Sequence, residues 1–176
     1  MKATEVTIAY LADYLQWLPI VAEWHFSEWS HLRPGQPVQA WNEKLKGVCG
    51  HQQLPTFFVA IEEGEPVGTS MLVKQSMTTH QNLFPWVGGV YVIPRLRKRG
   101  IGERLLDRAV REACVLGFER AYLYTIDRPD FYAKRGWTTL EHSLYREQSV
   151  TVMSYEIGPN QSVQPTPTAV TPRAKE

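Results

Sequence analysis

The chain has 176 residues, and 43% of them are hydrophobic, which is enough for a single domain with a packed core. Its 19 Lys and Arg residues are nearly balanced by 18 Asp and Glu residues, giving a formal net charge of +1. This balance argues against a generally basic nucleic-acid-binding protein, so any positively charged surface must be local.

The N-terminal segment and the cysteines indicate the compartment. The first ten residues, MKATEVTIAY, are too polar for the apolar part of a secretory signal, and no apolar run has the length of a membrane span. Cys49 and Cys114 lie in no metal-ligand spacing, so we expect free thiols in a reducing compartment. These features predict a soluble, cytoplasmic protein without a membrane partner.

In the first half of the chain, hydrophobic spacing alternates between the periods of a strand and of a helix. Alternating apolar residues predict a strand at 6–10, and helical spacing follows to about residue 32. Pro19 lies inside this stretch, so we expect a break or a helix start there. The pattern next predicts a short helix at 38–48, a hairpin at 56–75 and a strand ending at Pro94.

The second half contains the clearest helix of the sequence. From Gly100 to about Leu116 the apolar residues fall on one face, and Gly117 ends the pattern. A strand, a short helix with Pro129 in its first turn, and a hairpin at 137–157 follow.

The order of these elements predicts the fold class. A strand–helix–strand unit lies between antiparallel hairpins and requires one parallel strand pair beside the crossover helix. We therefore predict an α+β fold, with a mixed, mostly antiparallel sheet, a central β-α-β unit and flanking helices, in one domain at residues 1–157. Residues 158–176 are rich in Pro and Thr and contain no aromatic residue, which predicts a disordered tail.

The turn before the clearest helix is unusually basic, since RLRKR, residues 95–99, contains four cations and is followed by Gly-Ile-Gly. The first turn of a helix presents unpaired N–H groups and the positive end of the helix dipole, and glycine allows close approach. This combination predicts an anion site, most naturally for phosphate. A solvated basic loop, or a local nuclear-localisation or nucleic-acid patch, is the alternative.

The segment VYVIPRLRKRGIGERLL resembles the acetyl-CoA-binding segment of the GCN5-related N-acetyltransferases, the GNAT family. The family pattern Arg/Gln-x-x-Gly-x-Gly/Ala falls on residues 97–102, between a strand and a helix. A second segment, FYAKRGW at residues 131–137, resembles the family's Phe-Tyr-x-x-x-Gly-Phe sequence. The resemblance covers most of residues 4–157 and implies a GNAT-like fold that uses acetyl-CoA as co-substrate.

The resemblance also implies which residues contact the coenzyme. The end of the strand would pair by its main chain with the pantetheine arm, and the turn and helix start would bind the pyrophosphate. These residues are Val90, Tyr91, Val92, Arg97, Lys98, Arg99, Gly100, Ile101, Gly102 and Glu103. Gly88 and Gly89 indicate a bulge or splay that would admit the pantetheine, and a plain sheet kink is the alternative.

Acetyl transfer to an amine requires a neutral amine, a donor for the developing oxyanion and a proton for the leaving thiolate. The resemblance implies that Tyr132 is the general acid, because a phenol with a pKa of about 10 is protonated at neutral pH. A structural aromatic residue is the alternative. Asp127 is the candidate base, but an N-cap of the short helix fits its position before Pro129 better. Cys114, on the amphipathic helix, is interpreted as a packing residue.

The segment EWHFSEWSHL, residues 23–32, falls where the first helices of the family border the acceptor site. We predict Trp24 and Glu28 as substrate contacts, with a solvated glutamate as the alternative for Glu28. His25 lies on the apolar stripe and is expected to be a structural, hydrogen-bonded residue.

Together, these features predict an acyltransferase that transfers acetyl from acetyl-CoA directly to a primary amine, without a covalent enzyme intermediate or a metal. Acids at Glu28 and Asp127 would suit a cationic acceptor such as a polyamine, an aminoglycoside or a lysine, free or in a peptide. The alternative from another class is a non-catalytic acyl-CoA sensor. A homodimer is left open, and no nucleic-acid partner is expected.

Overall fold

The computed structural model describes residues 5–32, 34–47 and 49–158, and the predicted tail from residue 159 on lies outside them. The strands are β1 (Val6–Tyr10), β2 (Thr56–Glu62), β3 (Glu65–Val73), β4 (Trp86–Val92), β5 (Arg120–Thr125), β6 (Thr138–Tyr145) and β7 (Gln148–Glu156). The α-helices are α1 (Leu18–Trp29), α2 (Val38–Lys46), α3 (Ile101–Val115) and α4 (Pro129–Ala133). Short 3₁₀ turns are η1 (Leu11–Asp13), η2 (Leu15–Trp17), η3 (Ser30–Leu32) and η4 (Pro94–Leu96).

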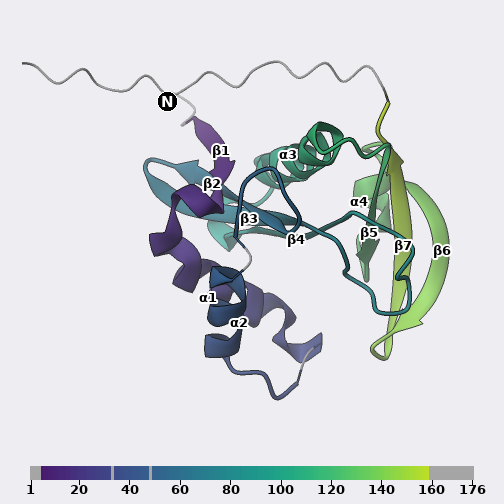
Figure 1. The fold of residues 1–176 in the computed structure, drawn as a ribbon, viewed down its shortest axis with the longest axis horizontal. Coiled ribbons are helices and arrows are strands. Elements are labelled where there is room, and N and C mark those ends of the chain that lie inside the picture. Colours follow the sequence, from purple (N-terminus) through teal and green to yellow (C-terminus); the bar gives the residue numbers. More distant parts are fainter. Residues whose placement is uncertain (1–4, 33, 48, 159–176) are drawn as a thin grey trace, which may run out of the picture.

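The strands form one seven-stranded sheet in the order β1-β2-β3-β4-β5-β7-β6 (Figure 1). All neighbouring strands are antiparallel except β4 and β5, which are parallel and are joined by α3. The predicted α+β class, the mostly antiparallel sheet and the parallel pair beside the crossover helix are therefore confirmed.

Both prolines expected near helix starts lie in first turns. Pro19 is in the first turn of α1, after the two 3₁₀ turns η1 and η2, so the helical stretch breaks where the sequence predicts. Pro129 is the first residue of α4.

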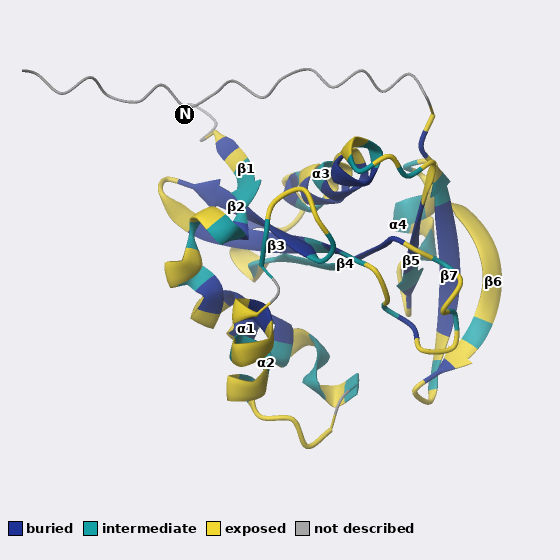
Figure 2. Ribbon diagram, viewed as in Figure 1, coloured by how far each residue is buried: buried dark blue, intermediate teal, exposed yellow. Residues whose placement is uncertain are grey.

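Helices cover both faces of the sheet, and β2 is buried on both sides (Figure 2). Phe58 and Ala60 point into the core that lies under α3, whereas Phe57 and Val59 point into the core under α1 and α2. Because successive side chains of a strand alternate between faces, a continuous apolar run such as TFFVAIE fits a strand buried on both faces.

Helix α3 is amphipathic, and its apolar stripe packs on the sheet. Ile101, Leu105, Leu106 and Ala109 are all at most 2% exposed, so this stripe excludes water from the β-α-β unit. Gly117 follows the helix with a φ of +83°, the left-handed conformation that glycine adopts without strain.

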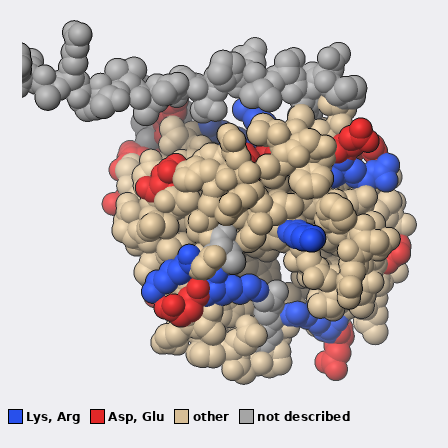
Figure 3. Space-filling model, in the orientation of Figure 1, with Lys and Arg blue, Asp and Glu red and all other residues tan. Residues whose placement is uncertain are grey.

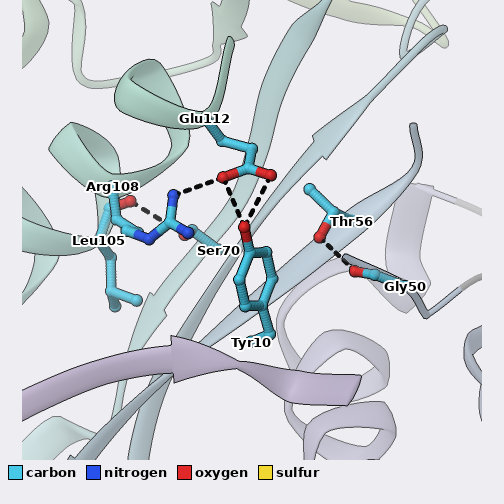
Figure 4. A network of polar contacts seen from close by, with 7 residues as sticks. All are labelled: Tyr10, Gly50, Thr56, Ser70, Leu105, Arg108 and Glu112. Carbon is cyan, nitrogen blue, oxygen red and sulfur yellow. Dashed lines mark hydrogen bonds and ion pairs between the residues drawn. The ribbon is translucent and has the colours of Figure 1, made fainter. Parts of the chain in front are cut away.

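A buried carboxylate fastens α3 to the first strand (Figure 4). The hydroxyl of Tyr10 lies 2.9 Å from both carboxylate oxygens of Glu112, and Arg108 Nη1 donates to Oε2 at 2.7 Å. Glu112 is 1% exposed, so these contacts balance a charge that would otherwise be costly to bury. On the facing strand β3, the Ser70 hydroxyl donates to the Leu105 carbonyl at 3.0 Å. The helix is therefore held in one position over the sheet.

Candidate active site

Strands β4 and β5 diverge soon after they meet. Within the described residues, their parallel register contains the single pair Trp86–Tyr122. On its other edge β4 has a bulge, because Met71 pairs with Gly88 and Thr69 pairs with Tyr91, which leaves two residues of β4 opposite one of β3. The predicted splay at Gly88-Gly89 is thus confirmed, and it opens a gap between the two strands.

Gly89 is required at this bulge for two reasons. Its φ is +57°, a conformation that strains other residues, and an added Cβ would lie 2.9 Å from His25 Cε1. The ring of His25 is buried and packs edge-on against Trp29 at 5.0 Å between centroids. The bulge and the end of α1 therefore fit closely together.

A cavity of about 230 Å³ lies beside the gap, and we call it the central cavity. Helices α1 and α2, strands β3, β4 and β5, the β5–α4 connection and the β6–β7 turn all contribute to its wall. Its lining residues are His25, Glu28, Trp29, Leu32, Trp41, Met71, Ser76, Val87, Gly88, Gly89, Val90, Leu123, Tyr124, Thr125, Ile126, Asp127, Arg128, Tyr132 and Arg146.

Three residues predicted from separate parts of the sequence meet at this cavity: Glu28, Asp127 and Tyr132. Trp24 is not among its lining residues. Its ring stacks on Tyr91 of β4 at 5.4 Å between centroids, so within the described residues its contact is with the strand and not with the cavity. The prediction that Trp24 lines the acceptor pocket is therefore not supported by the geometry.

Tyr132 is half-buried between aromatic rings and faces the cavity. Its ring lies 5.1 Å from that of Phe131 and 6.3 Å from that of Trp137, measured between centroids. Burial raises the pKa of its hydroxyl, and the nearby charge of Asp127 adds to this, while Arg128 and Arg135 act in the opposite direction. The phenol is consequently protonated at neutral pH and able to donate a proton.

Asp127 does not cap α4, so the interpretation favoured by its local sequence is wrong. The N-cap position belongs to Arg128, which makes no capping hydrogen bond with its side chain. The backbone N–H of Arg128 instead donates to Thr125 Oγ1 at 3.1 Å. The helix therefore begins one residue later than the sequence suggested, and the carboxylate of Asp127 is exposed on the cavity wall.

The main chain of β4 has one free edge along the gap. Ile93 N–H donates to Val67 O at 3.0 Å, so Tyr91, two residues earlier, also directs its main chain toward β3. Val90 and Val92 then face the opposite side, which agrees with a bond of 2.9 Å from Arg97 Nε to Val92 O. Of the three residues predicted to pair with pantetheine, Val90 and Val92 have the suitable orientation, and the Val92 carbonyl already accepts a hydrogen bond from Arg97.

The basic turn ends in a helix start that is open to a ligand. Lys98 and Gly100 have φ values of +63° and +77°, and the first intrahelical bond joins Arg104 N–H to Gly100 O at 3.2 Å. The amides of 101–103 therefore belong to the first turn, whose N–H groups have no partner within the helix. A Cβ on Gly102 would lie 3.8 Å from Val92 Cγ2 and 3.9 Å from Val90 Cγ1, so this turn packs against the side chains of these two residues of β4.

The cations of the turn have separate positions. Arg99 forms an ion pair with the nearly buried Glu62 at 2.9 Å, and Arg97 lies 3.8 Å from Glu28 and over the ring of Tyr91. Arg95 and Lys98 are exposed. On the face drawn in Figure 3, Lys and Arg side chains lie in separate patches and not as one continuous basic surface. The arrangement suits a small anion better than a long polyanion.

Several residues of the cavity wall were not predicted from the sequence, and four of them are aromatic or charged. Trp41 and Tyr124 line the central cavity with their rings, and Arg128 and Arg146 bring charge to it. Arg128 follows Asp127 directly, so its position next to the candidate base was a usable signal. Arg146 lies in the β6–β7 turn, and no local pattern connects it to a cavity whose other lining residues belong to different elements.

Comparison with known proteins agrees with this geometry. Residues 53–139, which include the bulge, the basic turn, α3 and α4, match the sequence profile described as an acetyltransferase (GNAT) domain. This segment of the chain is therefore a GNAT acetyltransferase domain. No curated protein matches the chain.

Solved structures of acetyltransferases have the same fold as this chain. The protein yncA of Salmonella typhimurium, solved with its cofactor acetyl-CoA, is 16% identical with a TM-score of 0.67, covering 94% of this chain and 99% of its own. An aminoglycoside 6'-acetyltransferase type Ii is 17% identical with a TM-score of 0.67, covering 87% and 98%. A spermidine N-acetyltransferase SpeG chimera from Vibrio cholerae and hSSAT is 16% identical with a TM-score of 0.63, covering 87% and 96%. At these identities the likeness is one of fold.

Among the described residues, no helix is both long and apolar enough to cross a membrane. The same residues contain no group of three or more His, Cys, Asp or Glu side chains arranged to hold a metal ion.

Proposed function

We propose that this protein is an acetyl-CoA-dependent N-acetyltransferase that acetylates a primary amine by direct transfer. One observation carries the proposal: Val90 belongs both to the wall of the central cavity and to the contact with the first turn of α3. A ligand held at that turn can therefore extend along the free edge of β4 and reach Tyr132 and Asp127. Two free thiols, Cys49 and Cys114, support the cytoplasmic location.

The residues along this path fit acetyl-CoA. The amides of 101–103 and the positive end of α3 suit the pyrophosphate, and Gly102 leaves the surface of the turn open. The outward main chain of Val90 and Val92 suits the amide groups of the pantetheine arm. When bound, acetyl-CoA supplies the thioester whose acetyl group is transferred.

Two side chains of the central cavity then act as the general base and the general acid. An amine in the central cavity attacks the acetyl carbon, so a C–N bond forms and the C–S bond breaks. The proton lost by nitrogen goes to Asp127, directly or through water, and Tyr132 gives its proton to the sulfur. A main-chain N–H on the free edge of β4 stabilises the negative charge that develops on the acetyl oxygen.

Two measurements test the proposal. Acetyl-CoA should raise the melting temperature, since a ligand that binds only the folded state stabilises it by mass action. Release of free thiol from acetyl-CoA should then increase when a suitable primary amine is added. Stabilisation by acetyl-CoA without thiol release for any amine tested would favour the non-catalytic sensor, and absence of stabilisation would oppose both functions.

A further inference from the structure

The charges that line the central cavity are balanced. Its four charged side chains, apart from His25, are two carboxylates, Glu28 and Asp127, and two guanidinium groups, Arg128 and Arg146. They come from α1, from the β5–α4 connection and from the β6–β7 turn, so three separate parts of the chain meet here. A polyamine, which carries only positive charge, would have to approach both arginines.

Most of these charges have no ionic partner in the protein. Among the described residues, no oppositely charged side chain lies within 4.0 Å of Asp127, Arg128 or Arg146, while Glu28 has Arg97 at 3.8 Å. Both signs of charge are therefore available to a ligand in a single cavity.

Arg146 is nevertheless held in place at the edge of the cavity. Its Nη1 donates to the carbonyl of Leu32 at 3.0 Å, and its guanidinium lies 5.2 Å from the centre of the Tyr145 ring. A guanidinium has five N–H donors, so one bond to a carbonyl leaves others for a carboxylate. The turn that carries Arg146 is thereby oriented toward η3.

The rest of the wall is apolar and aromatic. Rings come from Trp29, Trp41 and Tyr124, and aliphatic groups come from Leu32 and Ile126. Such a lining suits a ligand with a bulky apolar or aromatic body.

We propose that the acceptor is a small amine that also carries a carboxylate, an amino acid with a bulky apolar or aromatic side chain. Arg146 and Arg128 bind its carboxylate, Asp127 faces its amine, and the aromatic wall holds its side chain. This proposal rests on the proposed acetyltransferase function and narrows its substrate class. It replaces the cationic acceptor suggested by Glu28 and Asp127 alone.

The experiment compares L-phenylalanine with phenethylamine, which has the same ring and amine but no carboxylate, and includes spermidine as a polycation. We measure kcat/KM for each in the unaltered protein and in Arg146→Gln and Arg128→Gln. Arg111→Gln is the matched control, because Arg111 is an exposed arginine of α3 that does not line the cavity. Melting temperature and the shift caused by acetyl-CoA show whether each variant folds and binds the coenzyme.

We expect L-phenylalanine to be favoured over phenethylamine by about tenfold to a hundredfold, the effect of a hydrogen bond to a charged group. Either cavity variant should reduce this ratio toward one, while Arg111→Gln leaves it unchanged. Because the same two amines are compared in every variant, differences in their intrinsic reactivity cancel.

Equal or better use of phenethylamine or spermidine by the unaltered protein would overturn the substrate class and leave the acetyltransferase function standing. A preference for L-phenylalanine that survives both arginine substitutions would also overturn it. Binding of acetyl-CoA without acetylation of any amine would instead refute the acetyltransferase function itself. A binding measurement adds an independent readout: with CoA present, N-acetyl-L-phenylalanine should raise the melting temperature more than N-acetylphenethylamine.

Discussion

Two substitutions of Gly102 test whether the first turn of α3 binds the coenzyme. A Cβ at this position would make ordinary contacts of 3.8 and 3.9 Å with Val92 and Val90, so Gly102→Ala fits the protein itself. Replacing glycine by alanine at a compatible helical position stabilises by about 0.4–1 kcal/mol. For a domain of about 150 residues this corresponds to a rise in melting temperature of roughly 1–4 °C. Gly102→Leu has a similar helix propensity, but its longer side chain must extend over the open amides or press on the two valines.

The assay is the thermal shift caused by acetyl-CoA. At a concentration of about 100 times Kd, the coenzyme should stabilise the protein by about 2.7 kcal/mol. This is roughly 5–10 °C for a domain of this size. We expect Gly102→Ala to retain most of that shift and Gly102→Leu to lose it while remaining folded. A folded Gly102→Leu protein with an unchanged shift would refute the assignment of the pyrophosphate to this turn.

Three further substitutions test other parts of the site and the fold. Tyr132→Phe should lower kcat by about 10²-fold with little change in the thermal shift caused by acetyl-CoA. Because burial raises the pKa of Tyr132, its ionisation should cause no fall in kcat between pH 7 and about 9 in the unaltered protein. Such a fall would count against the role of Tyr132 as the general acid. Gly89→Ala should destabilise by about 1–3 kcal/mol, measured by chemical denaturation, since it adds a 2.9 Å contact with His25 to the strain of a φ of +57°. Gly64→Ala is its control, because Gly64 has a φ of +80° and open space around the added Cβ. An equal loss of stability in both variants would show that the contact with His25 contributes nothing to the loss in Gly89→Ala. Glu112→Gln should cost about 1–3 kcal/mol by weakening the bonds to Tyr10 and Arg108, and an altered acetyl-CoA shift would contradict its purely structural role.

Features governed by local spacing could be predicted from the sequence. The apolar stripe of α3, the hairpins and the helix start at Pro19 depend on residues close together in the chain, and the structure confirms them. The glycine pair in β4 was equally informative, because few residues other than glycine adopt the φ of +57° found at Gly89.

Features that depend on tertiary contacts were missed or mistaken. Asp127 has the local pattern of a helix cap, but the N-cap position belongs to Arg128, whose N–H donates to Thr125 Oγ1. The ion pair between Arg99 and Glu62 joins residues 37 positions apart, and Arg146 reaches η3 from a distant turn. Local patterns contain no information on such partners.

The contacts of the four cations in the basic turn show that the number of cations in a sequence overestimates the charge available to bind an anion. Glu62 neutralises Arg99, and Arg97 is shared between the Val92 carbonyl and Glu28, so two of the four cations are committed within the protein. These two link the turn to β2, β4 and α1 and thereby fix its position beside the free edge of β4. Arg95 and Lys98 remain exposed to contribute charge, while the amides of the first turn of α3 supply directional donors. The basic turn is thus better understood as a rigid support for a backbone anion site than as a cluster of anion-binding side chains.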